Sequence, residues 1–319
     1  MTPTSDGPPT KSADESGPRL WGVIGATGTG KSAFALDLVE ALRATGRDAE
    51  IVGADAMQLY RGMDIGTAKL PERERRGIPH HLLDVLDVTE DAAVAWYQSA
   101  ARGVIDGLHA RGADAVLVGG SGLYVSAVLF DFRFPPRDEA LRVRLEEELD
   151  RVGPDVLHGR LRDADPSAAA RIDPRNTRRI IRALEVLAQG DSTHGGALPA
   201  SQTPWYPRTR LLGLQRDRAE LVGALDHRVE QMWRDGLLDE VDGLRRAGLE
   251  RGTTAPRAIG YAQALAELRG EIERDEAIAQ TQSLTRRYAR RQVSWFRRYE
   301  GVRWMDGATA AESLAGSMA

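Results

Sequence analysis

The 319-residue chain contains no cysteine. This absence excludes disulfide bonds and thiolate metal sites, and it fits the reducing cytoplasm, where we expect this protein to be located. Long apolar runs are also absent, because no segment approaches the roughly 18 to 20 apolar residues that a membrane-spanning helix needs. The first eighteen residues contain no apolar stretch, so we expect neither a signal peptide nor a membrane anchor there but a disordered tail over residues 1–18.

Lysine is scarce, with only Lys11, Lys31 and Lys69, and the formal net charge is −4. That charge argues against a nucleic-acid partner, but its local distribution matters more than its sum. Residues 171–182 carry five arginines, and residues 286–298 carry six arginines with three interleaved aromatic residues. A solvated helix face is the ordinary interpretation of such runs. The aromatic residues and the lack of acidic partners in the second run favour a surface for a phosphate backbone.

Short apolar runs that end in Gly or Asp mark four expected strands. They begin at Leu20, Ala49, Asp114 and Thr209, and helical patterns such as SAFALDLVEALRA lie between the early ones. Such runs are typical of strands that are buried on both faces of a parallel sheet. The alternation of strand and helix therefore predicts a doubly wound α/β core.

The pattern becomes helical and charge-rich after the third expected strand, and it returns to a strand only at Thr209. We therefore expect an all-helical domain inserted into the core, followed by a linker rich in turn-forming residues, GDSTHGGALPASQTPWYP. After Arg216 the chain is expected to be largely helical to Tyr299. The expected segments are a core over 19–134, a helical insertion over 135–200, the rest of the core over 201–305, and a loose tail over 306–319.

Gly25, Gly30, Lys31 and Ser32 complete the pattern G-x-x-x-x-G-K-[ST] between the first expected strand and an expected helix. In such a P-loop, backbone N–H groups point at a phosphate, the lysine adds positive charge, and the serine hydroxyl can bind Mg²⁺. The motif makes the expected core P-loop NTPase-like, and it is shared with ATP-binding proteins, but it does not say which phosphate is bound.

A nucleotide-hydrolysing enzyme would also place an Asp after an apolar strand to hold Mg²⁺. The strand at Asp114 instead runs into GGSGLY, which leaves Asp84 as a candidate substitute. Asp55 stands where the second expected strand ends, at the edge that presents side chains to ligands, although a turn or a helix cap explains it equally well. His80 and His81 would point to opposite faces of a strand, so we expect structural or RNA-loop roles for them rather than a shared metal.

Eight segments resemble the tRNA dimethylallyltransferases, also called tRNA isopentenyltransferases, and they occur in that family's order. Together they span nearly the whole chain, from Val23 to Trp304. The segments are GATGTGKS, DAMQLYRGMDIGTAK, IPHHLLDVLD, GGSGLY, RNTRRIIRALEV, RVEQMWRDGLLDEV, RAIGYAQAL and RRYARRQVSWFRR.

The resemblance implies a prenyl transfer. In this family the P-loop holds the diphosphate of dimethylallyl diphosphate, and the isoprenoid passes to N6 of the adenosine just 3′ of the tRNA anticodon. Lys31, the loop amides, an arginine and Mg²⁺ on Ser32 would neutralise the leaving group. The exocyclic amine of adenine is a poor nucleophile, so a carboxylate must accept its proton, and Asp55 matches the base proposed for the family.

The resemblance also assigns the remaining site residues. The diphosphate would be bound by Gly25, Ala26, Thr27, Gly28, Thr29, Gly30, Lys31, Ser32 and Arg228. The tRNA would be contacted by Asp55, Ala56, Met57, Gln58, Ser121, Arg142, Arg178, Arg179, Arg182, Arg257, Gly260 and Tyr261. Asp55 and Ser121 are the expected catalytic residues, and Gln58 would read the flipped-out adenine by hydrogen bonds.

The chain departs from the family pattern at three of these places. Ser121 stands where the family usually has Thr, and Ala56 stands where Ser is common. Many members carry an arginine where this chain has Ala224, so Arg228 would carry more of the diphosphate clamp. We expect a monomer that acts on the anticodon stem-loop and requires Mg²⁺.

Two rival functions fit parts of the sequence. A P-loop nucleoside or nucleotide kinase has the same kind of sheet and an inserted lid, and it would use the arginines on ATP phosphates. A non-enzymatic RNA-binding module would explain the arginines, but it would not explain Asp55, Gln58 and the P-loop together.

Overall fold

The computed structural model describes residues 17–131, 134–135, 137–190, 202–307 and 309–310. Most of the expected disordered tail, most of the expected linker after Gly190 and the end of the expected C-terminal tail lie outside these residues. The described chain forms two compact units, one made of residues up to Phe130 and from Pro204 onward, the other of Asp131–Thr203. Within the described residues, no helix is long and apolar enough to cross a membrane.

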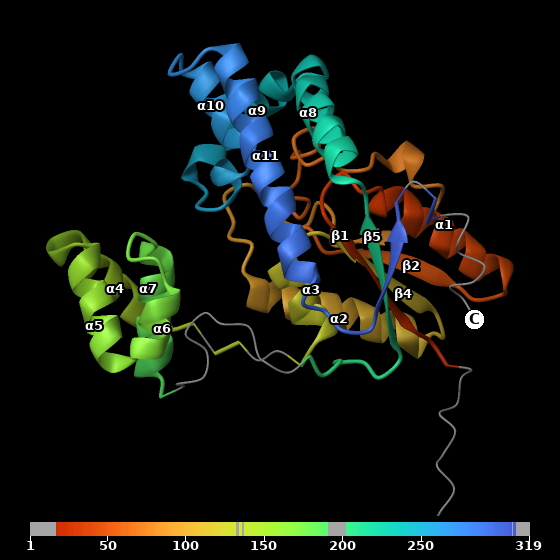
Figure 1. The fold of residues 1–319 in the computed structure, drawn as a ribbon, viewed down its shortest axis with the longest axis horizontal. Helices are drawn as coiled ribbons and strands as arrows, with labels where there is room; N and C mark the ends of the chain where they lie inside the picture. The colour runs from red at the N-terminus through yellow and green to blue at the C-terminus, as the bar shows by residue number, and fades with distance from the viewer. Residues whose placement is uncertain (1–16, 132–133, 136, 191–201, 308, 311–319) are drawn as a thin grey trace, which may run out of the picture. The chain divides into compact units, whose positions relative to one another are not determined.

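A six-stranded sheet forms the centre of the larger unit (Figure 1). Every pair of neighbouring strands is parallel, in the order β3-β2-β4-β1-β5-β6. The expected α/β class with a parallel sheet is therefore confirmed. The strands are β1 Leu20–Gly25, β2 Ala49–Gly53, β3 His80–His81, β4 Asp114–Gly119, β5 Thr209–Gln215 and β6 Val302–Asp306.

Strand β6 corrects the expectation for the end of the chain. Residues 302–305 fall in the expected helical second part of the core and Asp306 in the expected loose tail, but residues 302–306 form an edge strand parallel to β5. Only Met305 of this strand is buried, while its neighbour Trp304 is 37% exposed. A single edge strand of five residues is too short for periodicity to separate it from a loop. Its pairing partner β5 decides its conformation.

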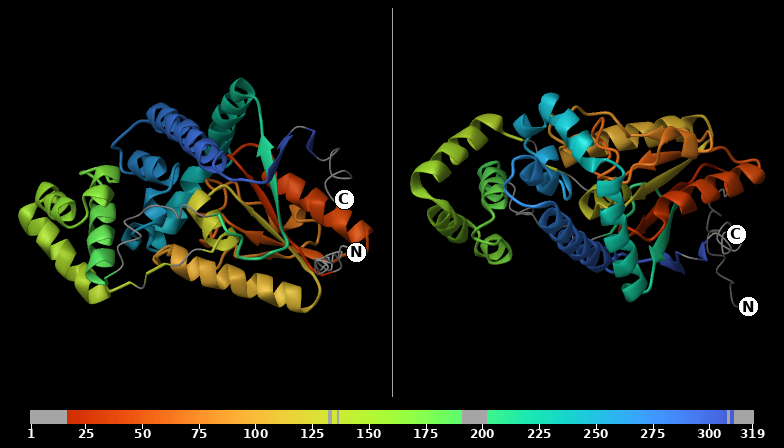
Figure 2. Two further views of the ribbon diagram at one scale, coloured as in Figure 1. Left: turned by 60° about the horizontal axis from the view of Figure 1, so that its bottom comes forward. Right: turned by 90° about the horizontal axis from the view of Figure 1, so that it is seen from above.

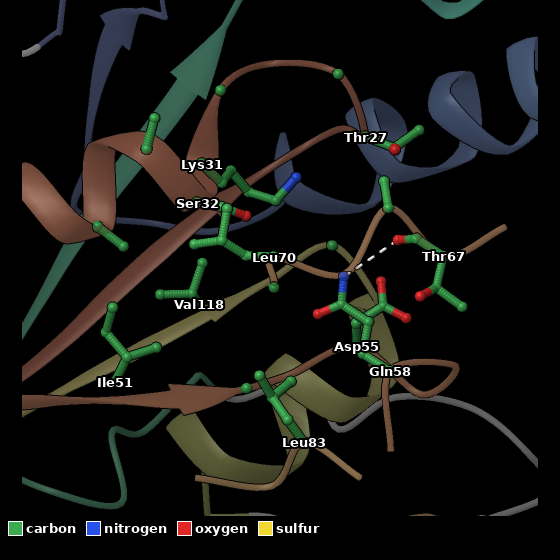
Figure 3. Close-up of a pocket in the computed structure, with 18 of the residues that line it drawn as sticks. Thr27, Lys31, Ser32, Ile51, Asp55, Gln58, Thr67, Leu70, Leu83 and Val118 are labelled. Carbon is green, nitrogen blue, oxygen red and sulfur yellow. Dashed lines mark hydrogen bonds between the residues drawn. The ribbon is translucent and has the colours of Figure 1, made fainter. Parts of the chain in front are cut away.

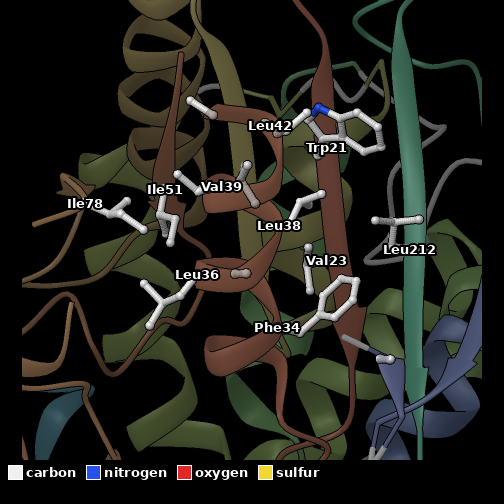
Figure 4. Packing of buried hydrophobic residues seen from close by; sticks show 14 of the residues in the cluster. Trp21, Val23, Phe34, Leu36, Leu38, Val39, Leu42, Ile51, Ile78 and Leu212 are labelled. Atoms are coloured by element: carbon white, nitrogen blue, oxygen red, sulfur yellow. The ribbon is translucent and has the colours of Figure 1, made fainter. Parts of the chain in front are cut away.

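The helices of the larger unit pack on both faces of the sheet, as Figures 1 and 2 show. Helix α1 covers one face and buries an apolar cluster with alternate residues of β1, such as Trp21 and Val23, under Phe34 and Leu38 (Figure 4). Helices α2 and α3 contact the sheet from the other face. The bounds are α1 Lys31–Ala44, α2 Val94–Ala110, α3 Gly122–Leu129, α8 Arg218–Arg234, α9 Leu237–Arg246, α10 Tyr261–Leu268 and α11 Arg274–Phe296, with short 3₁₀ turns at Glu72–Glu74, Leu249–Arg251 and Ala255–Arg257.

The smaller unit is helical and has a hydrophobic core of its own. Three of its helices begin after capping side chains: Asp138, Asp165 and Asn176 each accept a hydrogen bond from a backbone N–H of the first turn. The unit extends four residues before and three residues beyond the expected insertion over 135–200. Its helices are α4 Glu139–Val152, α5 Pro154–Ala164, α6 Pro166–Arg171 and α7 Thr177–Ala188.

Candidate active site

The P-loop connects the carboxyl end of β1 to the start of α1. Gly30, the residue before the helix, has a φ of 88°, a left-handed conformation that glycine adopts without steric cost. The Ala26 carbonyl accepts hydrogen bonds from Thr29 Oγ1 at 2.9 Å and from Lys31 Nζ at 2.7 Å. Two side chains of the loop region, Thr29 and Lys31, therefore hold the loop backbone through one carbonyl.

A cavity of about 260 Å³ opens in front of this loop. Figure 3 shows that Thr27, Lys31, Ser32, Asp55 and Gln58 project around it. Apolar side chains form the deeper wall, among them Ile51, Leu70, Leu83 and Val118. The cavity thus joins a polar phosphate-binding mouth to an apolar interior, which suits a ligand with one charged end and one hydrocarbon end.

The charges at the mouth favour an anion. Burial lowers the pKa of Lys31 to about 8, with Asp55 opposing and Arg228 adding to the shift. Burial also lowers the pKa of Arg228, whose guanidinium donates to Thr27 Oγ1 at 2.8 Å. Arg228 Nε is buried without a hydrogen-bond partner in the described part of the chain. Two desolvated cations and an unused donor leave a site that a bound anion would complete.

Asp55 and Gln58 lie on the loop that follows β2. The Asp55 carboxylate accepts a hydrogen bond from Met57 N at 2.9 Å, which makes a tight turn directly after the strand. Gln58 Nε2 donates to the Thr67 carbonyl at 3.1 Å, shown as the dashed line in Figure 3. The turn interpretation of Asp55 is therefore correct as local structure, and the same residue also lines the cavity.

A second cavity, of about 300 Å³, adjoins the first. Thr27, Asp55, Thr67 and Arg228 line both cavities, so they form a shared wall. The expected tRNA-contact residues that line the second cavity are Asp55, Ala56, Met57, Ser121, Arg257 and Tyr261. Gln58, the expected reader of the adenine, lines only the first cavity, and Gly260 lines neither. The site is therefore two compartments that meet at a carboxylate and an arginine.

A sequence model of the family described as IPP transferase matches residues 58–299. The chain belongs to this family. It is 61% identical over 284 residues to a tRNA dimethylallyltransferase of Clavibacter sepedonicus, covering 89% of this chain and 92% of that protein. The family expected from the eight sequence segments is confirmed, and with it the transferase class.

Solved structures agree with this assignment. A tRNA isopentenylpyrophosphate transferase from Bacillus halodurans is 35% identical, with a TM-score of 0.64, over 93% of this chain and 98% of that one. A eukaryotic dimethylallyltransferase, captured acting on tRNA, is 26% identical with a TM-score of 0.76, over 91% of this chain and 74% of that one.

Ser121 lies at the start of α3 in this IPP transferase. It is buried, and its hydroxyl accepts from Ala56 N at 3.3 Å and lies 3.4 Å from the Tyr288 hydroxyl. Burial, with the charge of Asp55, raises the pKa of Tyr288 to about 12, so this phenol stays protonated. The serine that replaces the usual threonine therefore still holds a polar position in the wall of the second cavity.

Gln292 is a site residue that sequence reasoning missed. Its side-chain carbonyl accepts from Thr27 N at 2.8 Å, and its amide donates to the Gly120 carbonyl at 2.8 Å. The residue is buried and lines the first cavity, while Tyr288 of the same helix lines the second. One sequence feature could have predicted this role for Gln292. It is a neutral polar residue in an arginine-rich helix, and its i,i+4 spacing from Tyr288 places both residues on the same face.

The helical unit of this family member separates its expected tRNA-binding arginines into two kinds. Arg182 contacts the buried Glu185 at 2.8 Å and donates to the Pro135 carbonyl, and Arg142 Nη1 lies 3.6 Å from the same Glu185. Arg178 and Arg179 are exposed and form no ion pair with any described residue. The structure thus gives Arg142 and Arg182 an internal partner and leaves the other two facing solvent.

Four other titratable residues, Asp84, Asp114, His80 and His81, have structural partners, and of these only His80 lines the first cavity. Asp84, considered above as a magnesium ligand, accepts from Lys69 Nζ at 2.6 Å and does not line the first cavity. Asp114 opens β4 and binds Arg47 and the Trp21 indole. His81 bonds Glu50 at 2.5 Å, while His80 Nδ1 bonds the Ile78 carbonyl.

Proposed function

We propose that the enzyme transfers a dimethylallyl group from dimethylallyl diphosphate to N6 of the adenosine immediately 3′ of a tRNA anticodon. The observation that carries the proposal is the shared wall: Asp55 and Arg228 line both the P-loop cavity and its neighbour. An allylic diphosphate would occupy the first cavity and the adenine the second, so that the two reactants would meet beside Asp55.

The P-loop side would bind and activate the leaving group. The diphosphate would be held by the loop amides, Lys31 and Arg228, and the hydrocarbon would lie against the apolar wall. As the allylic C–O bond breaks, negative charge moves onto the diphosphate, where cations already stripped of water stabilise it most strongly. The departing diphosphate carries the bonding electron pair away.

The Asp55 side would complete the transfer. The N6 amine forms the new C–N bond to the allylic carbon and loses one proton, which Asp55 accepts. Ser121 and Gln58 would position the adenine. Ser121 lies in the wall of the second cavity, and Gln58 is held by its hydrogen bond to the Thr67 carbonyl. Atoms balance: adenosine gains dimethylallyl in place of hydrogen, and diphosphate and a proton are released.

The residues at the cavity mouth fit a magnesium ion. Ser32 exposes a hydroxyl there, and no described residue forms a hydrogen bond with it. Within the described chain no three His, Asp or Glu side chains cluster as metal ligands, so Ser32 would hold Mg²⁺ together with the diphosphate oxygens. When bound, Mg²⁺ would neutralise leaving-group charge.

The direct experiment incubates the full chain with dimethylallyl diphosphate, Mg²⁺ and an anticodon stem-loop RNA that carries adenosine 3′ of the anticodon. Mass spectrometry should find one dimethylallyl group on that nucleoside, and an RNA with guanosine at the position should stay unmodified. Conversion of ATP to ADP without prenylation of RNA would contradict the proposal and favour the kinase function.

A further inference from the structure

The loop that follows β2 and carries Asp55 and Gln58 is anchored by a side chain from another element. Glu240 of α9 accepts hydrogen bonds from Asp64 N at 3.1 Å and Ile65 N at 2.8 Å through one oxygen. Its other oxygen accepts from Gly66 N at 3.4 Å and from the Tyr261 hydroxyl at 2.6 Å. One carboxylate thus receives three consecutive backbone N–H groups and a phenol.

The contact between Gly66 and Tyr261 adds a steric constraint to these bonds. A Cβ on Gly66 would lie 2.4 Å from the Tyr261 ring, so the loop backbone approaches this ring too closely for any side chain at position 66. Tyr261 is fully buried, and burial followed by the charge of Glu240 strongly raises its pKa. The phenol therefore remains a hydrogen-bond donor to Glu240 at any working pH.

The anchored segment leads directly into the shared wall of the two cavities. Gly66 lines the second cavity, and Thr67 lines both. The Thr67 carbonyl in turn accepts the Gln58 side chain, three residues after Asp55. Glu240 itself lines neither cavity, so any effect it has on the reaction passes through the loop.

We infer that Glu240 is a positioning residue for the transfer reaction: it fixes residues 64–67, and through the Thr67–Gln58 bond it holds the wall that presents Asp55 to both substrates. The inference rests on the proposed function. Charge-assisted hydrogen bonds to a carboxylate are stronger than neutral ones, and a site misplaced by about 1 Å loses on the order of a hundredfold in rate. Glu240 acts on the barrier without touching a substrate.

The test compares Glu240→Gln and Glu240→Ala with Asp239→Asn, which removes the same charge from the exposed neighbouring residue of α9. Glutamine retains one acceptor oxygen but places an NH₂ group where the second oxygen received Gly66 N. We expect Glu240→Gln to lower the single-turnover rate about tenfold and Glu240→Ala about a hundredfold. The dissociation constant for the RNA and the Tm of Glu240→Gln should stay close to those of Asp239→Asn.

Amide hydrogen exchange measures the anchor without relying on activity. Exchange at residues 64–66 should accelerate at least tenfold in Glu240→Ala and stay unchanged in Asp239→Asn. Unchanged exchange would overturn the anchor, and faster exchange with an unchanged single-turnover rate would overturn the positioning role. Failure of the proposed function is distinguishable, because it would show as no prenylation of the stem-loop RNA by the wild-type protein while the exchange result still held.

Discussion

At the scale of single residues, the site depends on charges that the fold has partly removed from water. Asp55, Lys31 and Arg228 lie close enough for Asp55 to act on the pKa values of both cations. A carboxylate between two desolvated cations is stable only while each has a partner. In the proposed reaction the substrates replace these partners: the diphosphate binds Lys31 and Arg228, and Asp55 accepts a proton from the amine.

Asp55→Ala should lower the single-turnover rate of prenyl transfer by about two to four orders of magnitude, because a general base acts on the barrier more than on ground-state binding. The dissociation constant for the stem-loop RNA should change less than threefold. Rapid-quench kinetics and filter binding measure the two quantities. A normal transfer rate combined with tenfold weaker RNA binding would show that Asp55 is a binding residue only.

The pKa of Lys31 predicts a pH dependence. Since burial lowers that pKa to about 8, the side chain is an ammonium below pH 8 and a neutral amine above it. The diphosphate requires the ammonium, so kcat/KM for dimethylallyl diphosphate should fall above pH 8, by up to about tenfold per pH unit. In Lys31→Arg this alkaline limb should disappear, because guanidinium stays protonated. A wild-type profile that is flat to pH 9.5 would contradict the assignment.

At the scale of elements, the loop between β2 and β3 is held at two points by charged side chains. Glu240 anchors residues 64–66, and the buried Lys69 closes the loop behind them. Lys69 Nζ donates to the Tyr60 carbonyl at 2.9 Å, to Asp64 at 2.7 Å and to Asp84 at 2.6 Å, so all three ammonium protons are used. The second anchor is thus a buried cation with a complete set of acceptors.

Lys69→Met should destabilise the fold by about 2 to 4 kcal/mol, because it leaves a buried carbonyl and two carboxylates without their shared donor. Arg73→Met is the matched control, since it removes an exposed cation of the same loop whose ion-pair partner among the described residues is the neighbouring Glu74, at 3.3 Å. Urea unfolding followed by circular dichroism measures both variants. Equal midpoints for the two variants would show that the Lys69 cluster contributes nothing to stability.

At the scale of the whole molecule, an acidic chain is proposed to bind a polyanion. Although the chain as a whole is acidic, arginines of the helical unit can bind RNA phosphates where their guanidinium groups are not held by an internal partner. Arg142 and Arg182 contact the buried Glu185, whereas Arg178 and Arg179 face solvent from α7. Removing all four would confuse loss of RNA contacts with damage to the core of the unit.

The double variant Arg178→Ala/Arg179→Ala should therefore weaken RNA binding and reduce the slope of log K against log salt by roughly 1.5 to 2, about one counterion per lost phosphate contact. The KM for dimethylallyl diphosphate should barely change. Arg246→Ala, which removes an exposed arginine paired with Asp242 on α9, should leave the slope unaltered. An unchanged slope in the folded double variant would move the RNA surface to the arginines of 286–298.

Sequence reasoning anticipated much of the site. The P-loop, the four main strands and the position of Asp55 after β2 follow from local patterns, because glycine spacing and apolar runs constrain the backbone over a few residues. The resemblance to the family then supplied Arg228, and the structure brings it to Thr27 across 201 residues of sequence. Roles in tRNA contact and catalysis, including those of Gly260 and Ser121, remain predictions.

The family, the fold class and the phosphate loop follow from the amino-acid order, since each rests on short segments whose pattern is complete within a few neighbouring residues. Only the packing of distant elements brings Gln292 to Thr27 N from 265 residues away, Glu240 to the loop after β2, and Arg142 of α4 to within 3.6 Å of Glu185 on α7. It also made β6 a strand by pairing it with β5. These partners depend on how elements that are distant in the sequence pack together, because a side chain satisfies its hydrogen bonds with whatever group the packing brings within about 3 Å.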